Sequence, residues 1–142
     1  MNSDTKEKTS SEIILENYEE KRKYQRIVVN CPVRLLLSGD RIIEVLAHDI
    51  SLGGMQIRCD GEALQILQSE GKKPGQRTDS DFEINFVLPL GDKRENIFLR
   101  CKLIYIAELE GDIYAIGLQF TNIEGDNRRT LKRFIKVSKE HL

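Results

Sequence analysis

The sequence predicts a mainly β fold: a six-stranded antiparallel barrel with a C-terminal helix and a short N-terminal helix or arm. Short apolar segments rich in β-branched residues recur between Gly, Asp and Ser residues, which is typical of strands joined by tight turns. Most of these segments follow one another without an intervening helix, which favours antiparallel pairing. A closed barrel leaves no strand edge exposed, and we therefore expect the sheet to close.

The first 20 residues are predicted to lie outside the barrel domain. Residues 1–10 are polar, and residues 11–21 combine apolar side chains at helical spacing with acids early and bases late. The helix dipole favours this order of charges, and a serine at the start is suited to cap the first turn. The chain is therefore divided into a polar tail with a short helix, residues 1–20, and a barrel domain, residues 21–142.

Six segments carry the strand pattern. In the clearest of them Phe82, Ile84, Phe86 and Leu88 alternate with other residues in strict period two, so one face is expected to be buried. Turn residues separate the segments, at 38–40, 91–96 and 110–112. The predicted strands span residues 27–38, 41–51, 54–59, 82–90, 97–109 and 113–123.

Two other segments break the strand rhythm. Residues 60–81 contain apolar side chains spaced for one or two helical turns, followed by a loop rich in Gly and Lys. Near the C-terminus, Leu131, Phe134 and Ile135 trace one face of a helix that begins at Asp126 or Asn127. The remaining surface of this helix carries many Lys and Arg side chains, which we expect to be solvated.

Composition excludes several classes of protein. The net charge of −1 provides no overall field that would attract nucleic acid or an anionic membrane. No apolar stretch approaches the ~20 residues of a membrane-spanning helix, and the N-terminus lacks the apolar core of a secretory signal. Three separated cysteines form no CxxC pair, and neither histidine lies near them at metal-ligand spacing. We expect a cytoplasmic protein with buried thiols, no metal and no membrane insertion.

Two arginines four residues apart, Arg22 and Arg26, precede the first predicted strand. A guanidinium group is planar and always charged, and its forked donors fit a phosphate or the Hoogsteen edge of guanine. Lys21 and Lys23 add positive charge beside them. On its own this spacing arises by chance in a chain with 32% charged residues, and an exposed basic segment is then the better explanation.

The second motif is the segment DISLGG, which lies between two apolar runs. The carboxylate of Asp49 accepts hydrogen bonds only, so it suits the adjacent N–H donors of guanine, and Ser51 can donate or accept beside it. Gly53 and Gly54 permit positive φ angles and let a flat ring approach the backbone. A hairpin turn with an Asx cap is the alternative explanation.

Taken together, the two motifs resemble those of the PilZ domain family, whose receptors bind cyclic di-GMP. The family pattern is RxxxR, a strand and hairpin, and then D/NxSxxG. Arg22 and Arg26 fill the first motif, and Asp49, Ser51 and Gly54 fill the second. The resemblance extends over residues 21–140 and includes the strand AIGLQFTNI and the basic closing helix.

The resemblance implies a cyclic di-GMP receptor that is not an enzyme. Arg22 and Arg26 would contact phosphate and guanine, Asp49 and Ser51 would hold a guanine edge, and Gly54 would shape the turn. Lys21, Lys23 and Gly53 are further candidate contacts. The polar arm is expected to become ordered on binding and so to alter protein contacts. Lys21 also suggests a second, stacked ligand molecule, and the downstream partner would belong to a motility, exopolysaccharide or transcription apparatus.

Three alternatives remain. A protein-interaction adaptor with the PilZ fold would bind the nucleotide weakly or not at all, although such proteins typically lack part of the motifs. A small barrel that binds single-stranded nucleic acid would need exposed aromatic side chains. Most of the phenylalanines instead fall in predicted strands, where we expect them in the core: Phe82, Phe86, Phe98 and Phe120. An enzyme would need a nucleophile–base pair, a metal cluster or a phosphate-binding loop, and no such motif is recognised in the sequence.

Overall fold

The computed structural model describes residues 26–74, 81–123 and 125–140, and it confirms the closed antiparallel barrel. Strand order around the barrel is β1-β2-β3-β6-β5-β4, and every neighbouring pair is antiparallel. The strands are β1 Ile27–Leu36, β2 Ile42–Ile50, β3 Gly54–Asp60, β4 Phe82–Leu90, β5 Lys93–Glu108 and β6 Ile113–Asn122. The predicted helix at 11–21 lies outside the described residues, as do Lys21, Arg22 and Lys23.

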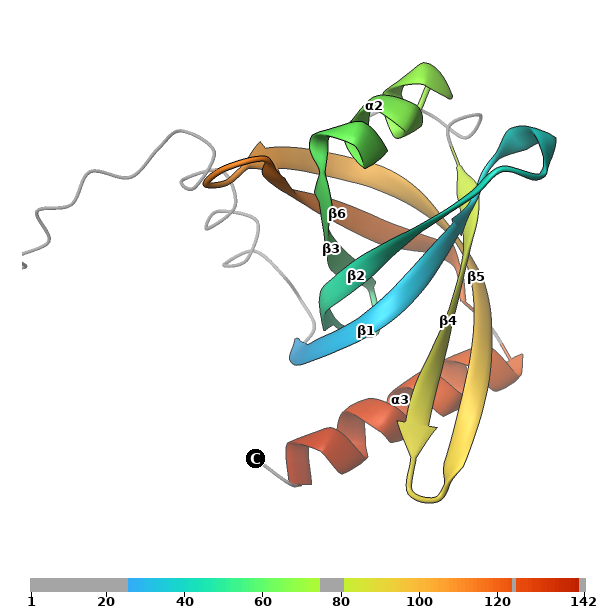
Figure 1. Cartoon of the computed structure of the whole chain (residues 1–142). Coiled ribbons are helices and arrows are strands. Elements are labelled where there is room, and N and C mark those ends of the chain that lie inside the picture. Colours follow the sequence, from blue (N-terminus) through green and yellow to red (C-terminus); the bar gives the residue numbers. More distant parts are fainter. Residues whose placement is uncertain (1–25, 75–80, 124, 141–142) are drawn as a thin grey trace, which may run out of the picture.

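Two helices close the barrel ends. Helix α2 (Gly61–Ser69) and helix α3 (Gly125–Glu140) lie at opposite ends of the barrel (Figure 1). Leu64 and Leu67 of α2 and Leu131 and Phe134 of α3 join the same core cluster as the inward side chains of the strands. The predicted apolar face of the C-terminal helix is confirmed, and its cations Arg129, Lys132, Arg133, Lys136 and Lys139 lie on the outer, solvent-facing side.

The strand boundaries differ from the prediction mainly at the hairpin between β4 and β5. Residues 91–96 were expected to form a turn, but β5 already begins at Lys93, which pairs with Leu90. The hairpin turn therefore consists of only two residues, Gly91 and Asp92. Such a tight turn needs a positive φ, and Gly91 adopts a φ of 64° without strain because it has no side chain. The predicted turn at residues 38–40 is a short 3₁₀ segment, and the backbone N–H of Leu37 donates to the carbonyl of Arg41 across it.

Two expectations about buried side chains were partly wrong. Cys101 is buried in the core, but Cys31 and Cys59 are only half-buried and pack against the core from its edge. Burial still raises the pKa of the Cys59 thiol to about 11, with a smaller contribution from Asp60 and Asp112. Phe98 was expected in the core, yet it is 52% exposed, because it follows the inward-facing Ile97 and so points outward.

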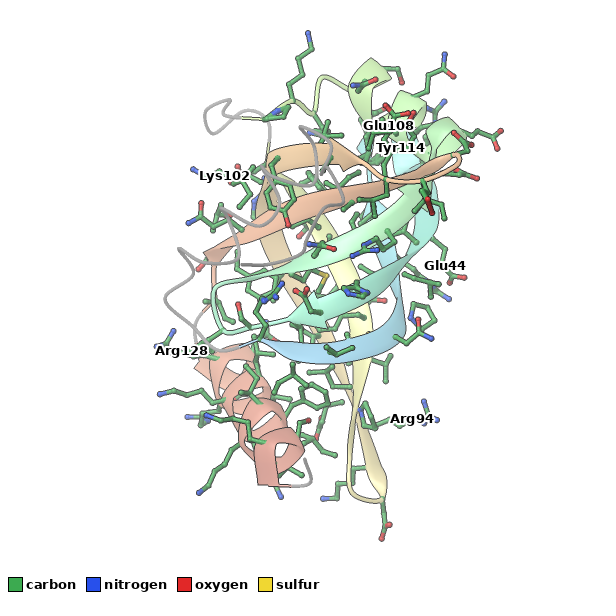
Figure 2. All side chains as sticks on the ribbon, turned by 90° about the vertical axis from the view of Figure 1, so that its left-hand side faces the viewer. Glu44, Arg94, Lys102, Glu108, Tyr114 and Arg128 are labelled. Carbon is green, nitrogen blue, oxygen red and sulfur yellow. The ribbon has the colours of Figure 1, made fainter. Side chains whose placement is uncertain are left out.

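The outer wall of the barrel is mostly polar. Glu44, Arg94 and Lys102 project away from the strands in Figure 2. Beside Glu44 and Lys102, the neighbouring residues Val45, Cys101 and Leu103 are buried in the interior. Within the part of the chain that the structure describes, no helix combines the length and the apolar character that a membrane span requires.

Candidate functional site

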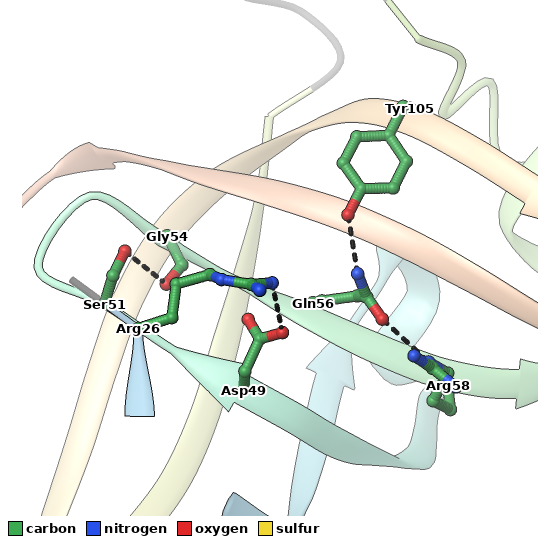
Figure 3. Close-up of polar contacts among 7 residues, drawn as sticks. All are labelled: Arg26, Asp49, Ser51, Gly54, Gln56, Arg58 and Tyr105. Carbon is green, nitrogen blue, oxygen red and sulfur yellow. Dashed lines mark hydrogen bonds and ion pairs between the residues drawn. The ribbon is translucent and has the colours of Figure 1, made fainter. Parts of the chain in front are cut away.

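The ends of β1 and β2 bring two of the predicted site residues together. Arg26 lies immediately before β1 and Asp49 lies near the end of β2, and the register pairs Val28 with Asp49 and Ile27 with Ile50. Nη1 of Arg26 donates a hydrogen bond of 2.8 Å to Oδ2 of Asp49 (Figure 3). These residues are 23 positions apart in sequence, so the antiparallel pairing alone makes them neighbours.

A bulge makes room for Asp49. Ala47 and Ile50 both belong to the core cluster although they are three positions apart, which regular alternation does not allow. The pairing of β2 with β3 shifts register between Ala47 and Asp49, and this irregularity allows Ala47 and Ile50 to face inward. The side chain of Asp49 therefore points away from the barrel core, and it contacts the guanidinium of Arg26.

The ion pair between Arg26 and Asp49 is poorly hydrated. The side chain of Asp49 is only 3% exposed, whereas that of Arg26 is 27% exposed. A buried carboxylate is costly unless it is paired and hydrogen-bonded, so the guanidinium offsets the loss of water around Asp49. The exposed part of Arg26 remains accessible from outside the barrel.

Ser51 organises the turn between β2 and β3. Its backbone N–H donates to the carbonyl of Gly54 at 2.8 Å, and its hydroxyl donates to the same carbonyl at 3.3 Å. The N–H of Gly53 donates to the Ser51 hydroxyl at 3.2 Å, and the carbonyl of Gly53 accepts from Phe120 of β6. The turn is therefore fixed both internally and to the neighbouring strand.

Gly54 is needed for a reason other than the one predicted. We expected a positive φ, but Gly54 is extended at the start of β3. A Cβ atom there would lie 2.1 Å from the carbonyl oxygen of Leu118 in β6, which is far inside van der Waals contact. The glycine thus permits a close approach of two strands directly beside Ser51 and Asp49.

A second polar network, which the sequence pattern does not predict, lies beside the motif. Gln56 of β3 is fully buried, and its side chain connects Tyr105 of β5 with Arg58 of β3 (Figure 3). The one hint in the sequence is a glutamine between Met55 and Ile57, which are both core residues. The identity of its partner on a distant strand has no local signal.

The structure therefore places five of the predicted residues at one corner of the barrel: Arg26, Asp49, Ser51, Gly53 and Gly54. It does not describe Lys21, Arg22 or Lys23, so their predicted roles stay predictions. Within the described ranges, no group of three or more His, Cys, Asp or Glu side chains is arranged to hold a metal ion.

Comparison with known proteins points to one family. A family model for the PilZ domain matches residues 20–136. No curated protein matches the chain.

Solved structures share the fold at low sequence identity. The inhibitor of motility MotI/DgrA from Bacillus subtilis has 16% identity and a TM-score of 0.62 over 84% of this chain and 52% of its own. YcgR in complex with c-di-GMP, from Escherichia coli, has 20% identity and a TM-score of 0.62 over 85% of this chain and 47% of its own. The chain thus spans about half the length of these two proteins.

The PilZ domain of YcgR from Escherichia coli, solved with c-di-GMP, is a closer match in length. It has 18% identity and a TM-score of 0.59, and the match covers 85% of this chain and 93% of that domain. At these identities the three structures establish a shared fold.

Proposed function

The chain belongs to the PilZ domain family, and on that premise we propose that it is a receptor for cyclic di-GMP rather than an enzyme. YcgR, which shares its fold, was solved in complex with this nucleotide. The observation that carries the proposal is the contact between Arg26 and Asp49. One residue from each of the two motifs meets the other on the barrel wall, beside the turn that contains Ser51 and Gly54.

The chemistry of these side chains suits a dinucleotide with two phosphates and two guanines. The guanidinium of Arg26 uses one donor for Asp49, and its forked geometry is also suited to a phosphate or to the O6 and N7 atoms of guanine. A carboxylate has about four acceptor positions, so Asp49 can hold Arg26 and also accept from guanine N1–H and N2. Ser51 and Gly54 then keep the wall beside the base in place.

The arm supplies the remaining contacts in this proposal. Arg22 contacts the phosphate or guanine, and Lys21 and Lys23 add positive charge beside it. The arm becomes ordered when the nucleotide binds. Ordering costs part of the binding energy, but it changes which surface is presented to a protein partner. The partner would belong to a motility, exopolysaccharide or transcription apparatus.

Isothermal titration calorimetry with cyclic di-GMP tests the proposal. We expect Arg22→Ala and Asp49→Ala each to weaken binding at least tenfold, because loss of a charge-assisted hydrogen bond costs about 1.5–3 kcal/mol. Arg34→Ala is the matched control, since the Arg34 side chain is 60% exposed on the barrel wall and pairs loosely with Glu44 at 3.9 Å. It should leave the affinity unchanged.

Two outcomes have defined meanings. If the wild-type protein does not bind the nucleotide at micromolar concentration, the receptor function is wrong and the adaptor alternative applies. The same titration gives the stoichiometry. One ligand per chain, unchanged by Lys21→Leu, would rule out the stacked pair of ligands.

A further inference from the structure

Arg58 lies beside the corner of the barrel that holds Arg26, Asp49, Ser51, Gly53 and Gly54, called here the two-motif corner. Nε of Arg58 donates to Oε1 of Gln56 at 2.7 Å, and Nε2 of Gln56 donates to the hydroxyl of Tyr105 at 2.8 Å. The glutamine is fully buried, the tyrosine is 3% exposed and the arginine is half-buried. The chain of hydrogen bonds thus runs from a buried tyrosine outward to a cation (Figure 3).

A glycine in β6 leaves room for the side chain of Tyr105. Strand β6 lies between β5 and β3, so Tyr105 must cross β6 to reach Gln56. Gly117 of β6 pairs with both of these residues, and a Cβ atom there would lie 2.1 Å from the ring of Tyr105. A register shift between Leu103 and Tyr105 breaks the alternation of β5 at this point. Tyr105 then packs with Ala107 and Ala115 in a small cluster separate from the main core.

The network fixes the orientation of the arginine. An arginine side chain only donates, so the amide oxygen of Gln56 must face Arg58 and its NH₂ group must face Tyr105. Both ends of the buried amide are therefore satisfied in a single orientation. The Nη1 and Nη2 groups of Arg58 make no hydrogen bond or ion pair with any described residue. The nearby carboxylate of Asp60 is used elsewhere, because it caps helix α2 by accepting from the N–H of Ala63 at 2.9 Å.

The position of this arginine suits a ligand that lies over the two-motif corner. Gln56 is the direct partner of Asp49 across β2 and β3. Arg58 lies two residues farther along the same face, about 7 Å away at the usual rise per residue. Figure 3 shows Gln56 between the Arg26–Asp49 pair and Arg58. A cyclic dinucleotide held at Asp49 extends far enough along the wall to meet the unused donors.

We propose that Arg58 is a further ligand-binding residue, which contacts a phosphate of the bound cyclic dinucleotide, and that Gln56 and Tyr105 are positioning residues that hold its guanidinium. This inference rests on the proposed receptor function. Two forked donors with no other partner among the described residues fit a phosphate, and a pre-oriented side chain loses little conformational freedom on binding.

The first test compares Arg58→Gln with the wild type and with Arg34→Gln by calorimetry at two salt concentrations. We expect Arg58→Gln to weaken binding of cyclic di-GMP about tenfold and to reduce its salt dependence, because an ionic contact with phosphate is lost. Arg34→Gln should match the wild type. If the wild type binds and Arg58→Gln binds equally well, the inference about Arg58 is wrong while the receptor function stands. Absence of binding by the wild type overturns both.

The second test isolates the positioning role. Tyr105→Phe removes the hydroxyl that accepts from Gln56, and we expect severalfold weaker binding in the wild-type background. In the Arg58→Gln background the same change should have no further effect, because its influence passes through Arg58. Equal losses in both backgrounds would contradict the positioning role. Thermal melts without nucleotide show whether each variant is folded, and Arg58→Gln is expected to melt like the wild type.

Discussion

At the scale of single residues, Gly54 shows how a motif residue can be required by packing. Its backbone is extended, so conformational freedom does not explain the glycine. The carbonyl oxygen of Leu118 occupies the space that any side chain would need. A larger residue would push β3 away from β6 next to Ser51, and the turn that flanks Asp49 would move with it.

We therefore predict that Gly54→Ala destabilises the fold by about 1–3 kcal/mol, in the range of other overpacking substitutions. Urea denaturation measures the change. Gly71→Asn is the matched control, because Gly71 has a φ of 81°, a Cβ atom there would have nothing within 4 Å, and asparagine tolerates this backbone region. An unchanged midpoint for Gly54→Ala would mean that β3 and β6 separate easily at this position.

At the scale of elements, helix α2 is held by contacts at both of its ends. Asp60 caps its start, and Leu67 is fully buried in the core. Beyond its last turn, Oε1 of Glu70 accepts from the backbone N–H of Ser38 at 3.1 Å and from the Ser38 hydroxyl at 2.5 Å. The helix is thereby attached to the hairpin between β1 and β2, so this end of the barrel is closed by one connected unit.

The attachment of Glu70 to Ser38 makes part of the stability depend on pH. Hydrogen bonds from Ser38, with a smaller effect of Arg41 and Lys72, lower the pKa of Glu70 in the folded state. A lowered pKa contributes stability above the unfolded value of about 4.3, and that contribution is lost as the pH falls through the folded value. We predict that Glu70→Gln is less stable than the wild type at pH 7 and that the difference shrinks at pH 3.

Urea denaturation at both pH values tests this prediction. Glu83→Gln is the control, because Glu83 is exposed on β4 and has no hydrogen bond or ion pair with the described residues. It should show little difference from the wild type at either pH. If Glu70→Gln lowers the free energy of unfolding by the same amount at pH 3 and at pH 7, the charge of the carboxylate does not contribute to stability.

At the scale of the whole molecule, binding at the candidate site and folding of the barrel are expected to be thermodynamically linked. The candidate site, with its proposed positioning residues, draws on β2, β3, β5 and Arg26 immediately before β1, so it is complete only when the barrel is closed. A ligand that binds the folded state alone stabilises it by mass action. Nucleotide binding should therefore be visible as increased resistance to unfolding of the entire barrel.

We predict that cyclic di-GMP at 100 times its dissociation constant stabilises the wild type by about 2.7 kcal/mol. The melting temperature should rise with ligand concentration, as measured by differential scanning calorimetry. Asp49→Ala at the same ligand concentration should show a much smaller rise. Equal rises in the two proteins would place the nucleotide away from this corner.

Much of the fold was predictable because the signals for it are local. The alternation of Phe82, Ile84, Phe86 and Leu88 identified β4 to the residue, and turn residues separated the other strands. The hairpin between β4 and β5 was less predictable, because polar residues are equally common in a solvent-exposed loop and in the exposed end of a hairpin. Here they pair across the two strands. Phe98 was misplaced because its residue type suggested the core, whereas the phase of β5 points it outward.

The sequence by itself determined the six strands, the closing helix and the motif that contains Asp49, Ser51 and Gly54, because alternation and motif spacing are properties of neighbouring residues. Only the tertiary structure decided that Asp49 is buried against Arg26 and that Tyr105 crosses Gly117 to hold Gln56. These contacts depend on strand register and on bulges in β2 and β5. Register joins residues that are distant in sequence, and a shift by one position would exchange the inner and outer faces of a strand.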